Sequence, residues 1–231
     1  MVWVAPTGIS AFGIKGWTIN FGLSIPVKEG KEFVQLPTSH LQCHQTQWRH
    51  VKLLILDKKS MVGRAQMGHC DRHLRQAFPE NAGDSLGGIP AIFFGDFAQL
   101  PPIGDTPLYT TTSSARKHAL TMEGRHVFES LKKSITLSRI FRQEGNDPEQ
   151  IQFCDALMRL RTYNSTEEDH KLFEKHFWDN LSQEERDRFK NKLHLLPTRV
   201  LVHETNIKRL SELGKPVVRC KAKHNCPAAR K

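Results

Sequence analysis

The chain has 231 residues, of which 38% are hydrophobic and 25% are charged. This composition supports a packed core and excludes a wholly disordered protein. No apolar run reaches the roughly 18–20 residues of a membrane span, and the N-terminus lacks the pattern of a secretory signal. Five cysteines are too few and uneven for a disulfide framework, which indicates a reducing compartment. We therefore expect an intracellular protein that is neither secreted nor embedded in a membrane.

The positive charge is concentrated at the C-terminal end. The 34 basic and 24 acidic residues give a net charge of +10. The segment from Lys208 to Lys231 holds eight Lys and Arg residues against one acid, Glu212, so it carries +7 and leaves +3 for the rest. A basic balance favours polyanionic partners such as nucleic acids. The tail is interpreted either as a source of phosphate contacts or as a solvated chain end.

The first half of the chain alternates apolar runs with helical segments. Val2–Val4 is a short apolar run before a Gly-bearing turn, and Ile9–Phe12 predicts the opening of a helix. Val51–Asp57 is almost continuously apolar, which is typical of a strand buried on both faces of a parallel sheet. Arg64–Phe78 reads as a helix, and Ile89–Asp96 repeats the apolar run followed by Gly and Asp. This order predicts an α/β fold.

The second half is mostly helical. A short strand is predicted at Ile135–Leu137, and residues 144–150 read as a linker. Two capping boxes, at Ser165–Glu168 and Ser182–Glu185, predict helix starts. Arg199–Val202 predicts a return to strand.

Two acids deserve separate consideration because of where they stand. Asp57 and Asp96 each follow an apolar run that predicts a parallel strand. In open parallel sheets, ligands bind at the carboxyl ends of the strands, so the two carboxylates are candidates for a shared site. The alternative is that each acid caps the helix or turn that follows it. The spacing leaves both interpretations open.

Several segments together resemble a known family. Val4–Ile19, Leu54–Gly63 and Phe94–Ile103 resemble, in order and spacing, the Pif-type (petite integration frequency) DNA helicases, including the helicases of Helitron transposons. Leu137–Gln143 is similar to the next motif of that family, and Arg199–Asn206 to the motif that opens its second motor domain. The resemblance covers nearly the whole chain, and Phe94–Ile103 is its most specific segment.

The resemblance implies a fold and a function. Residues 1–145 would form a RecA-like parallel sheet that lacks its first strand and phosphate loop. Residues 146–231 would form a helical linker, the start of a second RecA-like domain and the basic tail. The implied activity is an ATP-dependent 5′-to-3′ DNA helicase that acts in DNA repair, recombination or telomere maintenance, or in transposition. Its substrates would be ATP and single-stranded or forked DNA, with Mg²⁺ as cofactor, and the expected state is a monomer in the nucleus or the mitochondrion.

The family's nucleotide-handling roles fall on four residues of this chain. Asp57 would hold the Mg²⁺ that bridges the terminal phosphates. Asp96 and Gln99 would sense the γ-phosphate and couple it to bound DNA. Arg142 would reach the γ-phosphate across the cleft and neutralise charge there.

The family's DNA-contacting roles fall on the first two turns of the chain: Pro6, Thr7, Gly8, Phe12, Trp17 and Thr18. Backbone amides and the hydroxyls of Thr7 and Thr18 would contact phosphates, and Phe12 or Trp17 would stack on a base. The alternative for each of the two aromatic rings is a place in the core.

The sequence also departs from the family. No Gly-x-x-x-x-Gly-Lys-Ser/Thr phosphate loop occurs in it. We expect a truncation at the N-terminus, either in the gene model or by real decay. The pair Asp57-Lys58 stands where the family has Asp-Glu, and Asn20 stands where it usually has His. A protonated Lys cannot accept a proton from the attacking water and opposes Mg²⁺, so we expect impaired hydrolysis. A second hypothesis is therefore a non-catalytic remnant that binds single-stranded DNA, and a third is a fragment that folds poorly.

Overall fold

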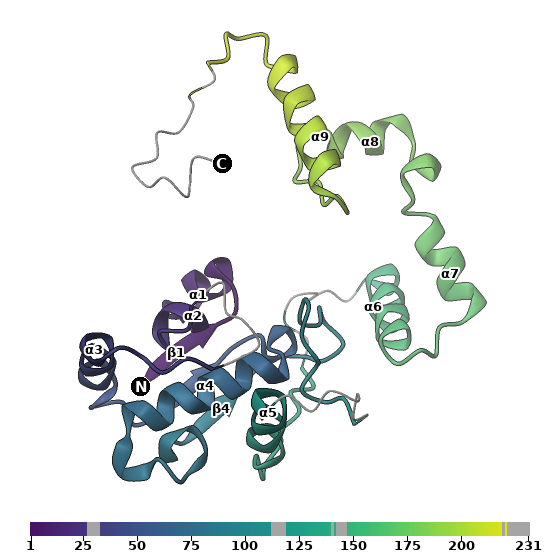
Figure 1. Ribbon diagram of the computed structural model, residues 1–231. Coiled ribbons are helices and arrows are strands. Elements are labelled where there is room, and N and C mark those ends of the chain that lie inside the picture. Colours follow the sequence, from purple (N-terminus) through teal and green to yellow (C-terminus); the bar gives the residue numbers. More distant parts are fainter. Residues whose placement is uncertain (27–32, 112–118, 140, 142–146, 219, 221–231) are drawn as a thin grey trace. The chain divides into compact units, whose positions relative to one another are not determined.

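The computed structural model describes residues 1–26, 33–111, 119–139, 141, 147–218 and 220 (Figure 1). The chain forms two compact units, Met1–Arg142 and Gln143–Lys231. We call the first the sheet unit and the second the helical unit.

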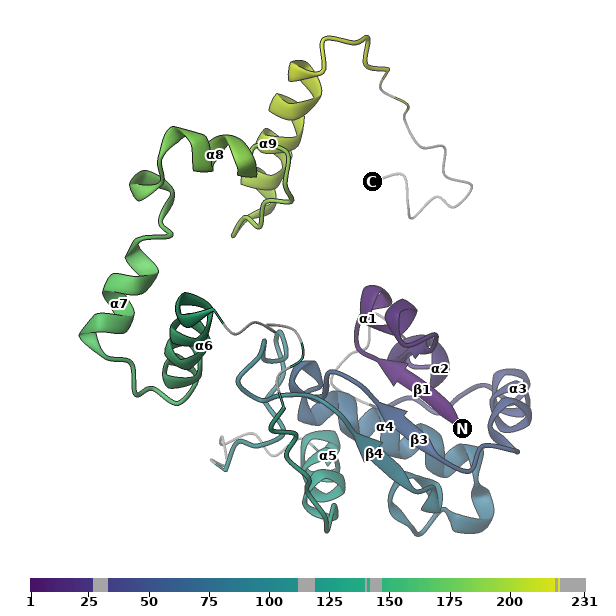
Figure 2. The ribbon, with the colours of Figure 1, turned by 180° about the vertical axis from the view of Figure 1, so that it is seen from behind.

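The sheet unit is built on four parallel strands in the order β2-β1-β3-β4 (Figures 1 and 2). These are β1 (Val2–Ala5), β2 (Trp17–Thr18), β3 (Leu54–Leu56) and β4 (Ala91–Phe93). All three neighbouring pairs are parallel. The predicted α/β fold is confirmed, although β3 and β4 are shorter than the apolar runs that contain them.

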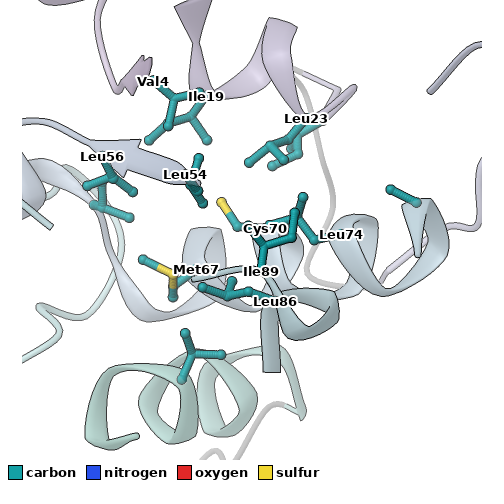
Figure 3. Close-up of a cluster of buried hydrophobic side chains, with 14 of the residues drawn as sticks. Val4, Ile19, Leu23, Leu54, Leu56, Met67, Cys70, Leu74, Leu86 and Ile89 are labelled. Atoms are coloured by element: carbon teal, nitrogen blue, oxygen red, sulfur yellow. The ribbon is translucent and has the colours of Figure 1, made fainter. Parts of the chain in front are cut away.

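Helix α4 (Arg64–Ala77) supplies the main layer over the sheet. Its buried side chains include Met67, Cys70 and Leu74, which belong to one core cluster with Leu54 and Leu56 of β3. Figure 3 shows these side chains pointing toward one another across the space between helix and strand. The helix is amphipathic because its apolar residues recur at three- and four-residue spacing, which places them on one face.

Two further helices complete the sheet unit. Helix α5 (Ala119–Glu129) packs against α4 so closely that a Cβ atom at Gly124 would clash with the Arg64 carbonyl. Helix α3 (Thr38–Trp48) ends in a fully buried tryptophan, and the Trp48 indole N–H donates to the Gly22 carbonyl at 2.9 Å.

Short helices link the strands of the sheet unit. Helices α1 (Gly8–Gly13) and α2 (Ile19–Gly22) follow β1 and β2 directly. Three 3₁₀ turns lie elsewhere: η1 (Lys59–Met61), η2 (Pro79–Asn81) and η3 (Ser85–Gly88).

Strand β4 is an open edge within the part of the chain that the structure describes. Only β3 pairs with it, and it leaves Ile92 45% exposed and the adjoining Phe94 42% exposed. All three residues of β3, by contrast, are buried. An apolar edge of this kind offers unpaired backbone groups and invites pairing with another strand.

The helical unit contains α6 (Pro148–Arg161), α7 (Glu167–Glu174), η4 (Trp178–Asn180), α8 (Gln183–Phe189) and α9 (Arg199–Glu212). The capping box predicted at Ser182 is confirmed, with Glu185 as its partner. The other predicted box lies one residue later, between Thr166 and Asp169. Among the described residues of the chain, no helix is long and apolar enough to cross a bilayer.

The strand predicted at Arg199–Val202 is wrong, because these residues form the first turn of α9. The Thr198 hydroxyl caps this helix by accepting a hydrogen bond from the Leu201 amide at 3.3 Å, and Gly214 follows its end with a φ of 62°. A capping Thr before the apolar residues and a left-handed Gly after them are helix boundary signals that outweigh a short β-branched run. The start of a second RecA-like domain therefore stays a prediction without this strand.

The strand predicted at Ile135–Leu137 is also wrong. The backbone there is irregular and pairs with no described strand. Ile135 is 88% exposed and Leu137 is 82% exposed. A strand exists only when a partner satisfies its backbone groups, and no described segment provides one here.

Candidate functional site

The ends of β3 and β4 bring two carboxylates to one edge of the sheet. Asp57 follows β3 directly, and its amide donates to the Val4 carbonyl of β1 at 2.9 Å. Asp96 follows β4 by three residues. Both are half-buried. Since β3 and β4 are parallel neighbours, their carboxyl ends meet at the same edge, as the sequence predicted.

The turns after the two strands are locked together. The Phe94 amide donates to the Leu56 carbonyl at 2.7 Å, and the Lys59 amide donates to the Phe94 carbonyl at 2.9 Å. These bonds extend the β3–β4 ladder past the strand ends. The turn after β3 and the turn after β4 therefore form one rigid rim.

Asp96 also caps the turn that follows it. Its carboxylate accepts from the Ala98 amide at 3.0 Å, and its carbonyl accepts from the Gln99 amide at 2.9 Å. Gln99 itself is exposed. The capping alternative raised for Asp96 is thus confirmed in the structure.

Asp57 differs from Asp96 because no described residue holds its carboxylate by a hydrogen bond or an ion pair. A half-buried carboxylate at a strand end is a suitable ligand for Mg²⁺, which binds one or two carboxylates together with phosphate oxygens. Lys58, the next residue, adopts a left-handed backbone with a φ of 57° and is half-buried. The side chain fits the metal, whereas its neighbour adds an opposing positive charge.

The two threonines assigned to phosphate contacts cap the short helices α1 and α2. The Thr7 hydroxyl accepts from the Ser10 amide at 3.3 Å and donates to the Ser10 hydroxyl at 2.9 Å. The Thr18 hydroxyl accepts from the Phe21 amide at 3.3 Å. Each hydroxyl thus has an intramolecular role at a helix start, which sequence reasoning did not consider.

The two aromatic candidates lie in different environments. Phe12 is 87% exposed, so the core alternative is wrong for this ring. Trp17 is half-buried, and its ring meets the ring of Phe21 edge to face with centroids 6.0 Å apart. Phe21 is itself 69% exposed and was missed by the sequence analysis. The sequence does contain a signal for its exposure: Ile19 and Leu23 are spaced to share one buried face, and Phe21 lies outside that face.

The remaining candidates are placed as follows. Pro6 is half-buried after β1, and Gly8 is exposed at the start of α1. Arg142 lies outside the described residues.

A parallel sheet with two acids at the carboxyl ends of its strands agrees with the α/β fold expected from the resemblance. The model of the PIF1-like helicase family matches residues 1–171. The chain belongs to the PIF1-like helicase family.

The PIF1-like chain is similar to full-length helicases over most of its length. The ATP-dependent DNA helicase PIF1 of Saccharomyces cerevisiae (strain YJM789) is 30% identical over 210 residues, which are 90% of this chain and 22% of the relative. The ATP-dependent DNA helicase RRM3 of Saccharomyces cerevisiae (strain ATCC 204508 / S288c) is 25% identical over 96% of this chain and 29% of the relative. The chain thus spans less than a third of these relatives.

Solved PIF1-like structures share its fold. The Pif1 helicase from Bacteroides in complex with ADP-AlF3 and ssDNA superposes with a TM-score of 0.68 at 26% identity, covering 94% of this chain and 48% of that one. The Pif1 helicase from Candida albicans gives a TM-score of 0.67 at 24% identity, covering 91% and 43%. The second likeness concerns the fold alone.

Proposed function

We propose that this chain contributes the Mg²⁺-binding and DNA-contacting parts of an ATP-dependent 5′-to-3′ DNA helicase motor. The observation that carries the proposal is the Asp57 carboxylate, which no described residue holds, at the same sheet edge as Asp96. A similar structure from Bacteroides contains ADP-AlF3 and ssDNA, which supports a nucleotide and a single strand as ligands. ATP and single-stranded or forked DNA are the proposed substrates.

Each residue of the nucleotide site would have a role set by its position. Asp57 would hold Mg²⁺, which neutralises charge on the terminal phosphates when it is bound. Asp96 and Gln99 stand on the adjoining turn and would couple the γ-phosphate to the DNA. Arg142 would contact the γ-phosphate and neutralise charge there.

Because of Lys58, the proposed activity includes ATP binding but not efficient ATP hydrolysis. The family has a Glu at this position, whose carboxylate accepts a proton from the attacking water. The ammonium group of Lys58 has no acceptor capacity while protonated, and it repels Mg²⁺ held one residue away. We propose that hydrolysis is strongly impaired even when a phosphate loop is supplied.

The second candidate function is binding of single-stranded DNA without catalysis. The Asp57-Lys58 pair favours it for this chain. A motor predicts ATP turnover that DNA stimulates. A remnant predicts DNA binding that ATP leaves unchanged and that weakens steeply with salt.

The decisive experiment joins the chain to a phosphate-loop segment taken from the Bacteroides Pif1 helicase and measures DNA-stimulated ATP hydrolysis. We expect little turnover with Lys58 and a large gain with Lys58→Glu. Asp57→Asn should abolish turnover in both backgrounds, which controls for contaminating ATPases. Full-rate hydrolysis with Lys58 in place contradicts the proposed impairment.

The cellular setting follows from the resemblance. We propose action as a monomer in DNA repair, recombination or telomere maintenance, or in transposition, within the nucleus or the mitochondrion. Localisation of a tagged chain and sedimentation of the purified protein test the compartment and the monomeric state.

A further inference from the structure

Two exposed aromatic rings lie on two successive short helices of the sheet unit. Phe12 on α1 is 87% exposed and Phe21 on α2 is 69% exposed. The flanking Ile19 and Leu23 are completely buried. Ile19 and Leu23, at the two ends of the one-turn helix α2, therefore pack in the core, while Phe21 between them faces the surface.

Two hydrogen bonds order the backbone around Phe21, and a ring contact holds its side chain. Its amide donates to the Thr18 hydroxyl at 3.3 Å, and the Asn20 side chain donates to the Ile25 carbonyl at 3.2 Å. The Trp17 ring meets the Phe21 ring at an interplanar angle of 76°. A ring held this way loses little conformational freedom when it stacks on a ligand, because its backbone is already ordered.

The charge around these rings suits a polyanion. Residues 1–26 contain no Asp or Glu, and their single charged side chain is the exposed Lys15 between the two helices. Helices α1 and α2 follow the carboxyl ends of β1 and β2, on the same edge of the sheet as Asp57 (Figures 1 and 2). Carboxylates near the rings would repel a phosphate backbone, so their absence favours a nucleic acid as the partner. An apolar protein surface would bind equally well with carboxylates nearby.

We propose that Phe21, together with Phe12, forms a stacking surface for the bases of single-stranded DNA. The inference rests on the DNA-binding part of the proposed function and adds a residue to it. Stacking on an aromatic face tolerates any base, so the surface selects a single strand rather than a sequence. A duplex hides its base faces and is bound less well.

The test measures binding of the 231-residue chain to a fluorescent oligothymidylate of roughly 15–20 nucleotides. Phe21→Ala should weaken binding roughly 5- to 150-fold, the range typical for loss of one base–aromatic stack. Phe21→Trp should restore it. Tyr163→Ala removes a ring that is 98% exposed on the helical unit and should leave binding unchanged.

A second arm separates stacking from a structural effect. With an oligonucleotide of equal length that carries only abasic sites, Phe21→Ala and the unaltered chain should bind equally. The slope of the logarithm of affinity against the logarithm of salt concentration should also stay the same, because no phosphate contact is lost. Equal weakening on the abasic strand, or no weakening on oligothymidylate, overturns the assignment of Phe21.

The outcomes also distinguish this inference from the proposed function. If the unaltered chain binds neither strand, DNA binding itself is refuted, and so is the proposed role of Phe21. If the unaltered chain binds and Phe21→Ala matches it, only the role of Phe21 is refuted. If Phe21→Ala leaves DNA binding intact and abolishes self-association of the chain, the ring serves a protein contact instead.

Discussion

The backbone of Gly95 lies directly against the backbone of Lys59. A Cβ atom added to Gly95 would stand 2.7 Å from the Lys59 nitrogen, and Gly95 has a φ of 140°, which side chains rarely adopt. The Lys59 amide donates to the neighbouring Phe94 carbonyl at 2.9 Å. This close approach joins the turn that carries Asp57 to the turn that carries Asp96.

Gly95→Ala should therefore destabilise the sheet unit by about 1–3 kcal/mol, the usual cost of a strained backbone position. Urea unfolding of the chain measures the change. Gly83→Ala is the matched control, because no atom lies within 4 Å of its added Cβ, and its effect should stay within about 0.5 kcal/mol. Equal effects of the two substitutions would show that the contact between the turns is not rigid.

His73 should make the stability of the sheet unit depend on pH. Burial, followed by the nearby His44 and His69, lowers the pKa of His73 to about 4. Neither ring nitrogen of His73 has a hydrogen-bond partner in the described structure. The unfolded chain, with an ordinary pKa near 6.5, takes up a proton that the fold excludes. Protonation of His73 therefore does not lower the free energy of unfolding above pH 6.5. Between pH 6.5 and 4 this free energy falls, by about 3 kcal/mol at most.

His73→Met removes the titrating group without leaving a polar atom unpaired. Thermal unfolding measured between pH 4 and 7.5 should show a flatter profile than that of the unaltered chain. His40→Met, at an exposed position on α3, should leave the profile as it is. A profile that keeps its full slope in His73→Met would assign the acid sensitivity to other groups.

Arg159 and Asp169 should couple α6 to α7. The guanidinium donates to both oxygens of the carboxylate, at 2.6 and 2.8 Å, and one oxygen also accepts from the Thr166 amide at 2.9 Å. The hydrogen bonds from Arg159, and to a smaller extent the one from the Thr166 amide, hold the pKa of Asp169 well below its usual range. The stabilisation is therefore present above the ordinary Asp pKa and is lost as the pH falls below it.

Arg159→Ala should lower the melting temperature of the helical unit and reduce its loss of stability on acidification. The comparison variant is Arg188→Ala, which breaks an ion pair whose side chains are 71% and 80% exposed. Exposed pairs of this kind contribute little, so the control should melt close to the unaltered chain. Identical melting of the two variants would deny Arg159 a structural role.

Gly124→Ala should separate α5 from α4, since its added Cβ would clash with the Arg64 carbonyl. We expect a loss of about 1–3 kcal/mol, typical of an overpacked contact, although Ala is the better helix former. Gly13→Ala, which meets no atom within 4 Å, should be neutral in the same urea titration. A stabilising effect of Gly124→Ala would mean that the two helices can move apart freely.

The sequence by itself determined the elements whose signals are local. The apolar runs that contain β1, β3 and β4 can be recognised in the sequence, and so can the acids that follow two of them. The clearest run contains β3, because a parallel strand buried on both faces needs continuous apolar residues. The helices α4 and α8 are readable from periodicity and a capping box. Lys58 is visible as a departure from the family without any structure.

Only the tertiary structure decided which segments meet. Ile135–Leu137 has the composition of a strand but no described partner, and strand formation depends on a neighbour that the local sequence does not encode. Likewise, the sequence leaves Phe12 either on a DNA base or in the core and assigns no role to Phe21. The structure exposes both rings and buries Ile19 and Leu23 beside them. Burial is set by how the elements pack around β1 and β2, so residue type alone cannot distinguish a core ring from a ring that is free to bind a ligand.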